Sequence, residues 1–200
     1  MRHYTILRTS EKPDWSAIPE LDVDNYQWLP PLDISMKAQL CYSDQGIHLH
    51  LRTWETNIRA QYTEPLSQVC EDSCMEFFLR PMAEDMRYFN FEMNPNGTSY
   101  LGFGGERNSR IRLIVKNEDQ LLDKQVHRLD DGWELFYTIP LSFLQTFYPG
   151  YTLTSGKILY ANCYKCGDLT AQPHYISWNP IDSDTPDFHR PDCFGEMILE

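Results

Sequence analysis

The sequence predicts an all-β domain, a β-sandwich or jelly roll with about 10–12 strands and one short helix. Many short segments alternate apolar and polar side chains, which is the period of a half-buried strand. Turn signals such as SDQG, NPNG, GFGG, DDG, YPG and TSG separate these segments. No stretch has the composition of a linker, so we expect residues 1–200 to form a single domain.

The predicted strands cover residues 35–42, 46–54, 75–79, 88–94, 111–115, 124–129, 133–139, 158–164, 174–178 and 196–199. Their regular spacing favours two packed antiparallel sheets. The helix is predicted at residues 141–147, directly after Ile139-Pro140 and with Ser142 near its start. The GFGG run at residues 102–105 is interpreted as a turn between strands.

The segments 75–79 and 88–94 are predicted to form a hairpin, because only RPMAEDMR separates them. The register that keeps every large apolar side chain on the core face pairs Leu79 with Phe89, Phe77 with Phe91, and Met75 with Met93. That register also places Glu76 opposite Glu92, and Cys74 opposite Asn94. Two facing carboxylates repel, so this pair needs a compensating cation, a shared proton or a ligand.

Composition excludes several function classes. The 200 residues carry 17 Lys and Arg against 29 Asp and Glu, a net charge of −12, which argues against nucleic-acid binding. No apolar run of about 18 residues is present, so no membrane span is expected. The start lacks the apolar core of a secretory signal, which predicts a cytoplasmic location. The acidic balance favours a neutral or cationic ligand over a phosphorylated or uronic one.

The six cysteines are expected to be thiols, because disulfides belong to secreted chains. Two close pairs, Cys70 with Cys74 and Cys163 with Cys166, leave open a zinc site of four thiolates. The CEDSC spacing suits zinc poorly, and Cys163 and Cys166 of one strand would point to opposite faces. Buried thiols are therefore the favoured interpretation.

Several segments, in chain order, resemble the family 9 carbohydrate-binding modules. They are CEDSCMEFFLRP, YFNFEMNPNG, DGWELFYTIPLSFL and YISWNPIDSDTPDFHRPDCFGEMIL, with ELDVDNYQW a looser match near the start. The chain is most similar to a divergent group of that family that carries the YKCGD, PHY-SW and FHRP motifs. The resemblance implies a β-sandwich of jelly-roll type whose inherited ligand is the end of a glucan chain.

The chain departs from the family at the sugar clamp. Members of the family grip sugar between two Trp side chains, whereas Cys70 and Phe188 occupy those places here. Glu92 stands where the family has an Arg, and Glu76 and Asn94 match its polar sugar-binding positions. The resemblance thus implies a changed ligand site in which half of the aromatic clamp is lost.

The candidate ligand-binding residues are polar and aromatic side chains of the expected concave face and one loop: Glu76, Glu92, Asn94, Tyr164, Lys165, Trp178, Phe188 and His189. The first three would bond hydroxyl groups, and the aromatic side chains would supply apolar faces. His189 would close the site from a loop stiffened by Pro186 and Pro191. Alternatives remain open: Trp178 in the core, Lys165 in solvent, and His189 as a loop anchor.

The predicted function is binding of a carbohydrate without catalysis, with no catalytic domain linked in residues 1–200. One alternative is a glycoside hydrolase that uses Glu76 and Glu92 as general acid and as nucleophile or base. The other is a protein-interaction domain that has lost sugar binding. No P-loop, G-x-S-x-G or H-E-x-x-H motif points to another enzyme class.

Acidic residues gather in predicted loops, at Asp22, Asp24, Asp130, Asp131, Asp182, Asp184 and Asp187. Calcium takes oxygen ligands in such loops, and the family resemblance implies structural calcium. No D-x-[DN]-x-[DN]-G loop occurs, so a solvated acidic surface is the alternative.

Overall fold

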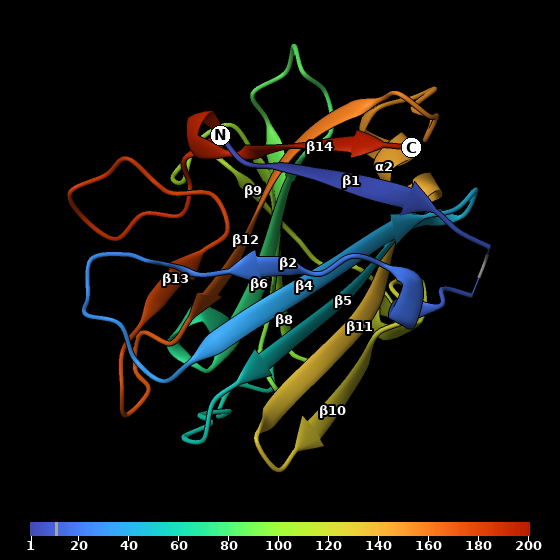
Figure 1. Cartoon of the computed structure of the whole chain (residues 1–200). Helices are drawn as coiled ribbons and strands as arrows, with labels where there is room; N and C mark the ends of the chain where they lie inside the picture. Colours follow the sequence, from blue (N-terminus) through green and yellow to red (C-terminus); the bar gives the residue numbers. More distant parts are fainter. Residues whose placement is uncertain (11) are drawn as a thin grey trace.

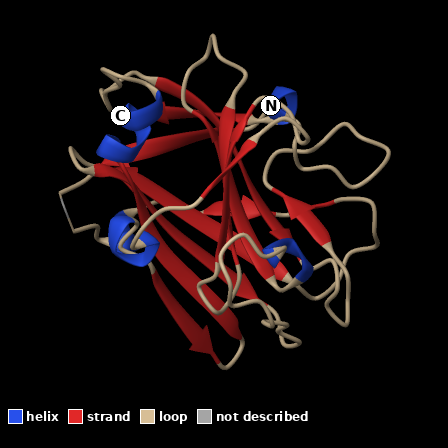
Figure 2. Cartoon of the chain, turned by 180° about the vertical axis from the view of Figure 1, so that it is seen from behind, coloured by secondary structure: helices blue, strands red, loops and turns tan. Residues whose placement is uncertain are grey.

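The computed structural model describes residues 1–10 and 12–200, and within them strands dominate the fold (Figure 2). The strands are β1 His3–Arg8, β2 Leu21–Val23, β3 Asn25–Tyr26, β4 Ser35–Tyr42, β5 Gly46–Trp54, β6 Cys74–Arg80, β7 Tyr88–Met93, β8 Ser99–Gly104, β9 Ile111–Leu113, β10 Gln125–Leu129, β11 Gly132–Pro140, β12 Ile158–Cys166, β13 Tyr175–Ser177 and β14 Gly195–Leu199. The helices are α1 Glu118–Leu121 and α2 Leu141–Phe147, with short 3-10 turns at Trp15–Ala17, Val69–Glu71 and Pro191–Cys193. None of the helices in the described ranges has the length and apolar character needed to cross a membrane.

The predicted all-β sandwich and the helix at residues 141–147 are confirmed. The described residues form fourteen strands, more than expected. The additional strands are β1, β2, β3 and β8, which were not predicted from the sequence pattern. The interpretation of GFGG as a turn is wrong, since Gly102 pairs with Asn90 and with Arg112 inside the sheet. The second helix, α1, was also missed, and its four residues carry no apolar stripe.

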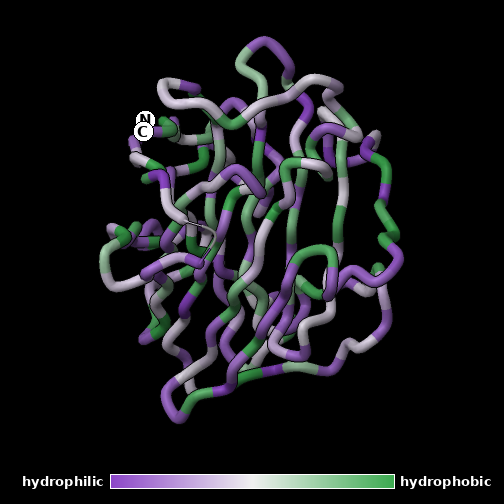
Figure 3. The backbone as a smooth tube through the Cα atoms, turned by 90° about the vertical axis from the view of Figure 1, so that its right-hand side faces the viewer, coloured by the Kyte–Doolittle hydropathy of each residue, from purple (hydrophilic) through white to green (hydrophobic). Residues whose placement is uncertain are grey.

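β1 joins the two sheets of the sandwich. It pairs in parallel with β14 through residues 3–6 and with β4 through Leu7 and Arg8, and Figure 1 shows β1 and β14 side by side. One sheet contains β10, β11, β5 and β4, and the other contains β14, β12, β6, β7, β8 and β9. Side chains from both sheets, such as Leu49 and Phe77, share one apolar core. Hydrophobic and hydrophilic residues alternate along many strands (Figure 3).

The sheet with β6 and β7 is buried on both faces, unlike a typical sandwich sheet with one solvated face. Its inner face meets the main core. Its outer face carries a second apolar cluster, which contains Val69, Cys74, Phe78, Tyr88, Tyr100, Tyr164, Cys166, Ile181, Phe188 and Phe194. Val69 and residues 181–194 belong to connecting segments, so these segments cover the outer face.

Lys165 is fully buried on the inner side of this sheet. Its Nζ lies 3.2 Å from Glu55 Oε1 and 2.8 Å from His174 Nε2. Trp133 Nε1 and Ser73 Oγ donate to the same Glu55 carboxylate, at 2.8 and 2.9 Å. The sequence left two possibilities for Lys165: a cation that pairs with the facing glutamates, or a side chain in solvent. Both are wrong, because alternate residues of a strand point to opposite faces and Lys165 points to the face opposite Glu76 and Glu92.

His174 gives this network a pH dependence. Burial, followed by the charge of Lys165, lowers the pKa of His174 to about 4, and its Nδ1 donates to Gln172 O at 2.7 Å. The unfolded chain takes up this proton below about pH 6.5, whereas the folded chain resists it until about pH 4. The stability that His174 contributes is thus complete above pH 6.5 and declines as the pH falls.

We predict that His174→Gln destabilises the protein at pH 7.5 and that its deficit relative to wild type shrinks by roughly 2–3 kcal/mol at pH 4.5. Urea unfolding of both proteins at each pH measures the difference, in which the other titrating groups cancel. His3→Gln, at an exposed position of β1, is the control. A deficit that stays constant or grows on acidification would contradict the assignment.

Candidate functional site

A row of four side chains crosses the outer face of the second sheet. The pairing of β12, β6, β7 and β8 aligns Tyr164, Glu76, Glu92 and Tyr100. The predicted hairpin register is confirmed, with Met75 and Phe77 of β6 facing their expected partners in β7. The two glutamates consequently face one another on the side away from the main core. Glu76 is 2% exposed and Glu92 is 6% exposed.

A cavity of about 330 Å³ lies over this row. Its lining combines strand side chains with loop side chains: Trp28, Gln68, Cys70, Glu76, Glu92, Tyr100, Arg107, Asn108, Arg110, Arg112, Cys166, Asp168, Tyr175, Pro186, Asp187, Phe188 and His189. A larger hollow of about 1160 Å³, near Trp15 and Phe136, lies against the other sheet and is more open. The smaller cavity is the better candidate because it contains the paired carboxyl groups.

The carboxyl groups of the floor have few partners. Cys166 Sγ donates to Glu76 Oε1 at 3.0 Å, and Asn90 Nδ2 donates to Glu92 Oε1 at 2.9 Å. In the described part of the chain, neither glutamate forms an ion pair. Burial raises the pKa of Glu92 to about 7, and burial followed by the charge of Glu92 raises the pKa of Glu76 well above its usual value. The floor therefore holds protons that a hydroxyl-bearing ligand can share.

Three arginines, at positions 107, 110 and 112, form one wall of the cavity. Arg107 lies 3.6 Å from Asp187, and the guanidinium groups of Arg110 and Arg112 lie over the ring of Tyr100 at 5.6 and 5.5 Å. Sequence reasoning missed this wall, although GERNSRIRL concentrates the arginines within six residues. The net charge of the chain is therefore a poor guide to the charge of the cavity.

His189 closes the cavity beside this wall. Its Nδ1 lies 2.8 Å from Tyr88 OH and 2.6 Å from Arg110 Nη1. Burial, followed by the charges of Arg110 and Arg107, lowers the pKa of His189 to about 2, so the imidazole is neutral. His189 thus both lines the site and anchors its loop, which combines the two interpretations left open by the sequence.

Gly102 in β8 makes room for the polar floor. A Cβ at this position would overlap with Asn90 Oδ1 and would lie 3.2 Å from Arg110 Cδ. The missing side chain lets Asn90 reach Glu92 and lets the stem of Arg110 cross the strand. The glycine that concealed this strand from sequence analysis is therefore a requirement of the site.

Another part of the lining is aromatic. Phe188 stacks on Tyr164 with ring centroids 4.2 Å apart, and Tyr164 OH donates to Phe188 O at 3.1 Å. Trp28 lies 5.7 Å from Phe188, and its Nε1 donates to Ser183 O at 2.7 Å. Trp28 has φ 59, a left-handed conformation that is costly for a residue with a Cβ and that often marks a functional site. Its position in the proline-flanked QWLPP segment was the signal available in the sequence.

The structure brings four of the candidate residues to the cavity: Glu76, Glu92, Phe188 and His189. Tyr164 lies beneath Phe188 instead of at the surface. Trp178, 4% exposed, belongs to the main core. Lys165 lies on the other side of the sheet, as described above.

Asn94 holds a turn and does not line the cavity. Its Nδ2 donates to Asp72 Oδ2 and to Tyr62 O, both at 2.8 Å. Its Oδ1 accepts from the backbone N–H groups of Asn96 and Thr98, both at 3.0 Å. Every polar atom of the side chain is thereby used inside the protein.

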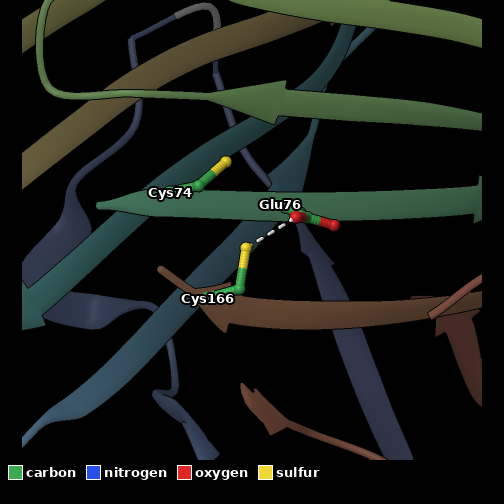
Figure 4. A group of neighbouring side chains, drawn as sticks. All are labelled: Cys74, Glu76 and Cys166. Atoms are coloured by element: carbon green, nitrogen blue, oxygen red, sulfur yellow. Dashed lines mark hydrogen bonds between the residues drawn. The ribbon is translucent and has the colours of Figure 1, made fainter. Parts of the chain in front are cut away.

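The zinc site of four thiolates does not form, because Cys163 lies in the main core and Cys166 lies on the outer face. Cys74, Glu76 and Cys166 do converge on the outer face (Figure 4). Across the described ranges, they are the only group of three His, Cys, Asp or Glu side chains whose possible metal-ligand atoms all lie within 4.8 Å of one another. Two of the acidic residues named as possible calcium ligands pair with arginines. Asp24 pairs with Arg2 at 2.6 Å, and Asp131 pairs with Arg52.

Comparisons with known proteins agree with this geometry. A family model described as carbohydrate-binding family 9 matches residues 3–199. A structure from Bacteroides uniformis, of a protein assigned only provisionally to carbohydrate binding, is 27% identical, with TM-score 0.85 and coverage of 100% of this chain and 99% of that chain. A search of curated proteins found no match.

Two structures of a family 9 carbohydrate-binding module from Caldicellulosiruptor kristjanssonii share the fold at 13% identity. The complex with glucose has TM-score 0.72 and covers 100% of this chain and 96% of that chain. The complex with cellotriose has TM-score 0.71 and covers 100% and 94%.

We predict that Gly102→Ala displaces Asn90 from Glu92 and lowers the free energy of unfolding by about 1–3 kcal/mol, the usual cost of overpacking. Gly105→Ala is the matched control, because its nearest neighbouring atom lies 4.0 Å from the added Cβ. Urea unfolding of both variants checks the prediction. Equal stability of the two would show that Gly102 is not needed for packing.

Proposed function

The chain belongs to carbohydrate-binding family 9, and from that premise we propose that it binds the end of a neutral sugar or oligosaccharide in the cavity over β6 and β7 without hydrolysing it. One observation carries the proposal. The facing pair Glu76 and Glu92 forms the floor of a 330 Å³ cavity whose lining also contains three arginines and the aromatic side chains of Trp28 and Phe188.

These groups match the chemistry of a sugar. Hydroxyl groups both donate and accept hydrogen bonds. The carboxyl groups of the floor can accept a hydrogen bond in either protonation state and can donate one when protonated. Arg110 and Arg112 supply further donors, and the faces of Phe188 and Trp28 suit the apolar side of a pyranose ring. The volume lies at the lower end of the range for small-ligand sites, which suits one sugar residue with its neighbour extending outward.

The charges of the cavity support a neutral ligand. The positive charges of the three arginines are offset by Asp168 and Asp187 and, in part, by Glu92, whose pKa is raised to about 7, so neither sign dominates strongly. The glucose and cellotriose complexes of the structural relatives point the same way.

Binding is supported over hydrolysis by the family to which the chain belongs, whose model is described as carbohydrate-binding. A glycosidase pair needs one ionised carboxylate and one carboxylic acid. Burial raises the pKa of Glu92 to about 7 and that of Glu76 well above its usual value, so below neutral pH both carboxyl groups are mostly protonated and neither can act as the nucleophile or base. Release of nitrophenol from a panel of chromogenic glycosides, abolished in both Glu76→Gln and Glu92→Gln, would contradict this part of the proposal.

We predict that Glu92→Gln weakens binding of glucose and cellotriose at least about tenfold, because the amide cannot ionise and replaces one acceptor oxygen of the carboxylate by a donor. Isothermal titration calorimetry measures the loss. Glu196→Gln, on β14 and outside the cavity, is the control and keeps wild-type affinity.

Three outcomes would change the conclusion. Undiminished binding by Glu92→Gln would place the sugar elsewhere. Tighter binding of glucuronate than of glucose would replace the neutral ligand by an anionic one. Failure to bind any member of a glycan array would favour the protein-interaction alternative.

A further inference from the structure

We propose that Cys74, Glu76 and Cys166 form a site for a thiolate-binding divalent cation, with zinc as the best match, at one end of the cavity floor. Figure 4 shows Cys166 pointing toward Glu76, with Cys74 close by on the same strand as Glu76. Their sulfur and oxygen ligand atoms all lie within 4.8 Å of one another.

Strand pairing places the three ligands. Cys166 of β12 lies directly opposite Cys74 of β6, and Glu76 follows two residues later on the same side of β6. Zinc–sulfur bonds of about 2.3 Å place tetrahedral ligand atoms roughly 3.8 Å apart. Small rotations of side chains on two hydrogen-bonded strands would therefore bring the donors to bonding distance, with no movement of the backbone.

The three groups lack the partners that buried polar atoms normally have. Glu76 receives one described hydrogen bond, from Cys166 Sγ at 3.0 Å. Cys74 Sγ lies 3.8 Å from Met75 O, and its other partner is the thiol of Cys166, itself one of the proposed ligands. All three residues are buried, and the neighbouring Glu92 adds a second carboxyl group without an ion pair in the described chain. A cation would satisfy the facing carboxyl groups, which strand geometry otherwise forces into repulsion.

The donor set selects the metal. Two thiolates and one carboxylate suit zinc, whereas calcium takes six to eight oxygen ligands. Binding requires both thiols and the carboxyl group of Glu76 to release their protons to solvent. Three protein ligands leave the fourth position open, and Glu76 and Cys166 both line the cavity. The open position would therefore face the cavity, where a water molecule can occupy it.

The test titrates reduced, chelator-treated protein with zinc and, separately, with cobalt. We expect one equivalent of zinc, and a cobalt spectrum with thiolate charge-transfer bands in the near ultraviolet. Cys74→Ser and Cys166→Ser should each lower zinc affinity at least about 100-fold, and Glu76→Gln about tenfold or more. Cys193→Ser is the matched control, a half-buried cysteine that does not line the cavity.

Absence of stoichiometric zinc, unchanged affinity in Cys166→Ser, or a cobalt spectrum without thiolate bands would overturn the site. If the serine variants do not fold, X-ray absorption of zinc-loaded wild type decides instead: two sulfur ligands near 2.3 Å support the site and none refutes it. Glucose titration of zinc-free and zinc-loaded wild type keeps this proposal separate from sugar binding. Zinc without sugar binding would refute only the proposed function, and sugar without zinc binding would refute only the metal site.

Discussion

The pairing of β6 with β7 decides what each face of the second sheet can do. Phe77 and Phe91 enter the main core together, so their neighbours Glu76 and Glu92 must meet on the other face. A shift of one residue in the register of these strands would point Glu76 and Glu92 into the main core and Phe77 and Phe91 to the outer face. The carboxyl groups would then be buried among aromatic rings. The same packing force that stabilises the sandwich thus holds two acidic groups together, at a place where they repel one another.

That constraint explains why the outer face is covered. A solvated outer face would let water separate the two carboxyl groups, whereas here Phe188, Tyr164 and Tyr100 surround them with apolar surface. Exclusion of water strengthens each remaining polar contact and makes each missing one costly. Gly102 belongs to this arrangement, because its absent side chain admits Asn90 to the floor.

The hairpin and the helix at residues 141–147 were predictable because their signals are local: alternation along two neighbouring strands, and a proline that begins a short apolar helix. The positions of Lys165 and Asn94 were not predictable. Their partners, Glu55 and Asp72, come from the segment between β5 and β6, which is distant in sequence from both residues. Arg107 and Arg110 of the arginine wall lie between β8 and β9, where no periodic pattern assigns a side chain to a face, and Arg112 lies in the three-residue strand β9.

The two faces of β6 and β12 differ in how many partners the protein supplies to a buried glutamate. On the inner side, Glu55 has Lys165, Trp133 and Ser73 as partners, so its charge and hydrogen bonds are answered within the chain. On the outer side, Glu76 has one thiol. A buried ionic network that is complete needs no ligand, and one that lacks a partner costs stability for as long as the partner is absent. The difference is spatial as well as energetic, since the complete network is enclosed by the core and the incomplete one opens into the cavity. The missing partner of Glu76 and Glu92 is therefore best sought in the molecule or ion that enters there.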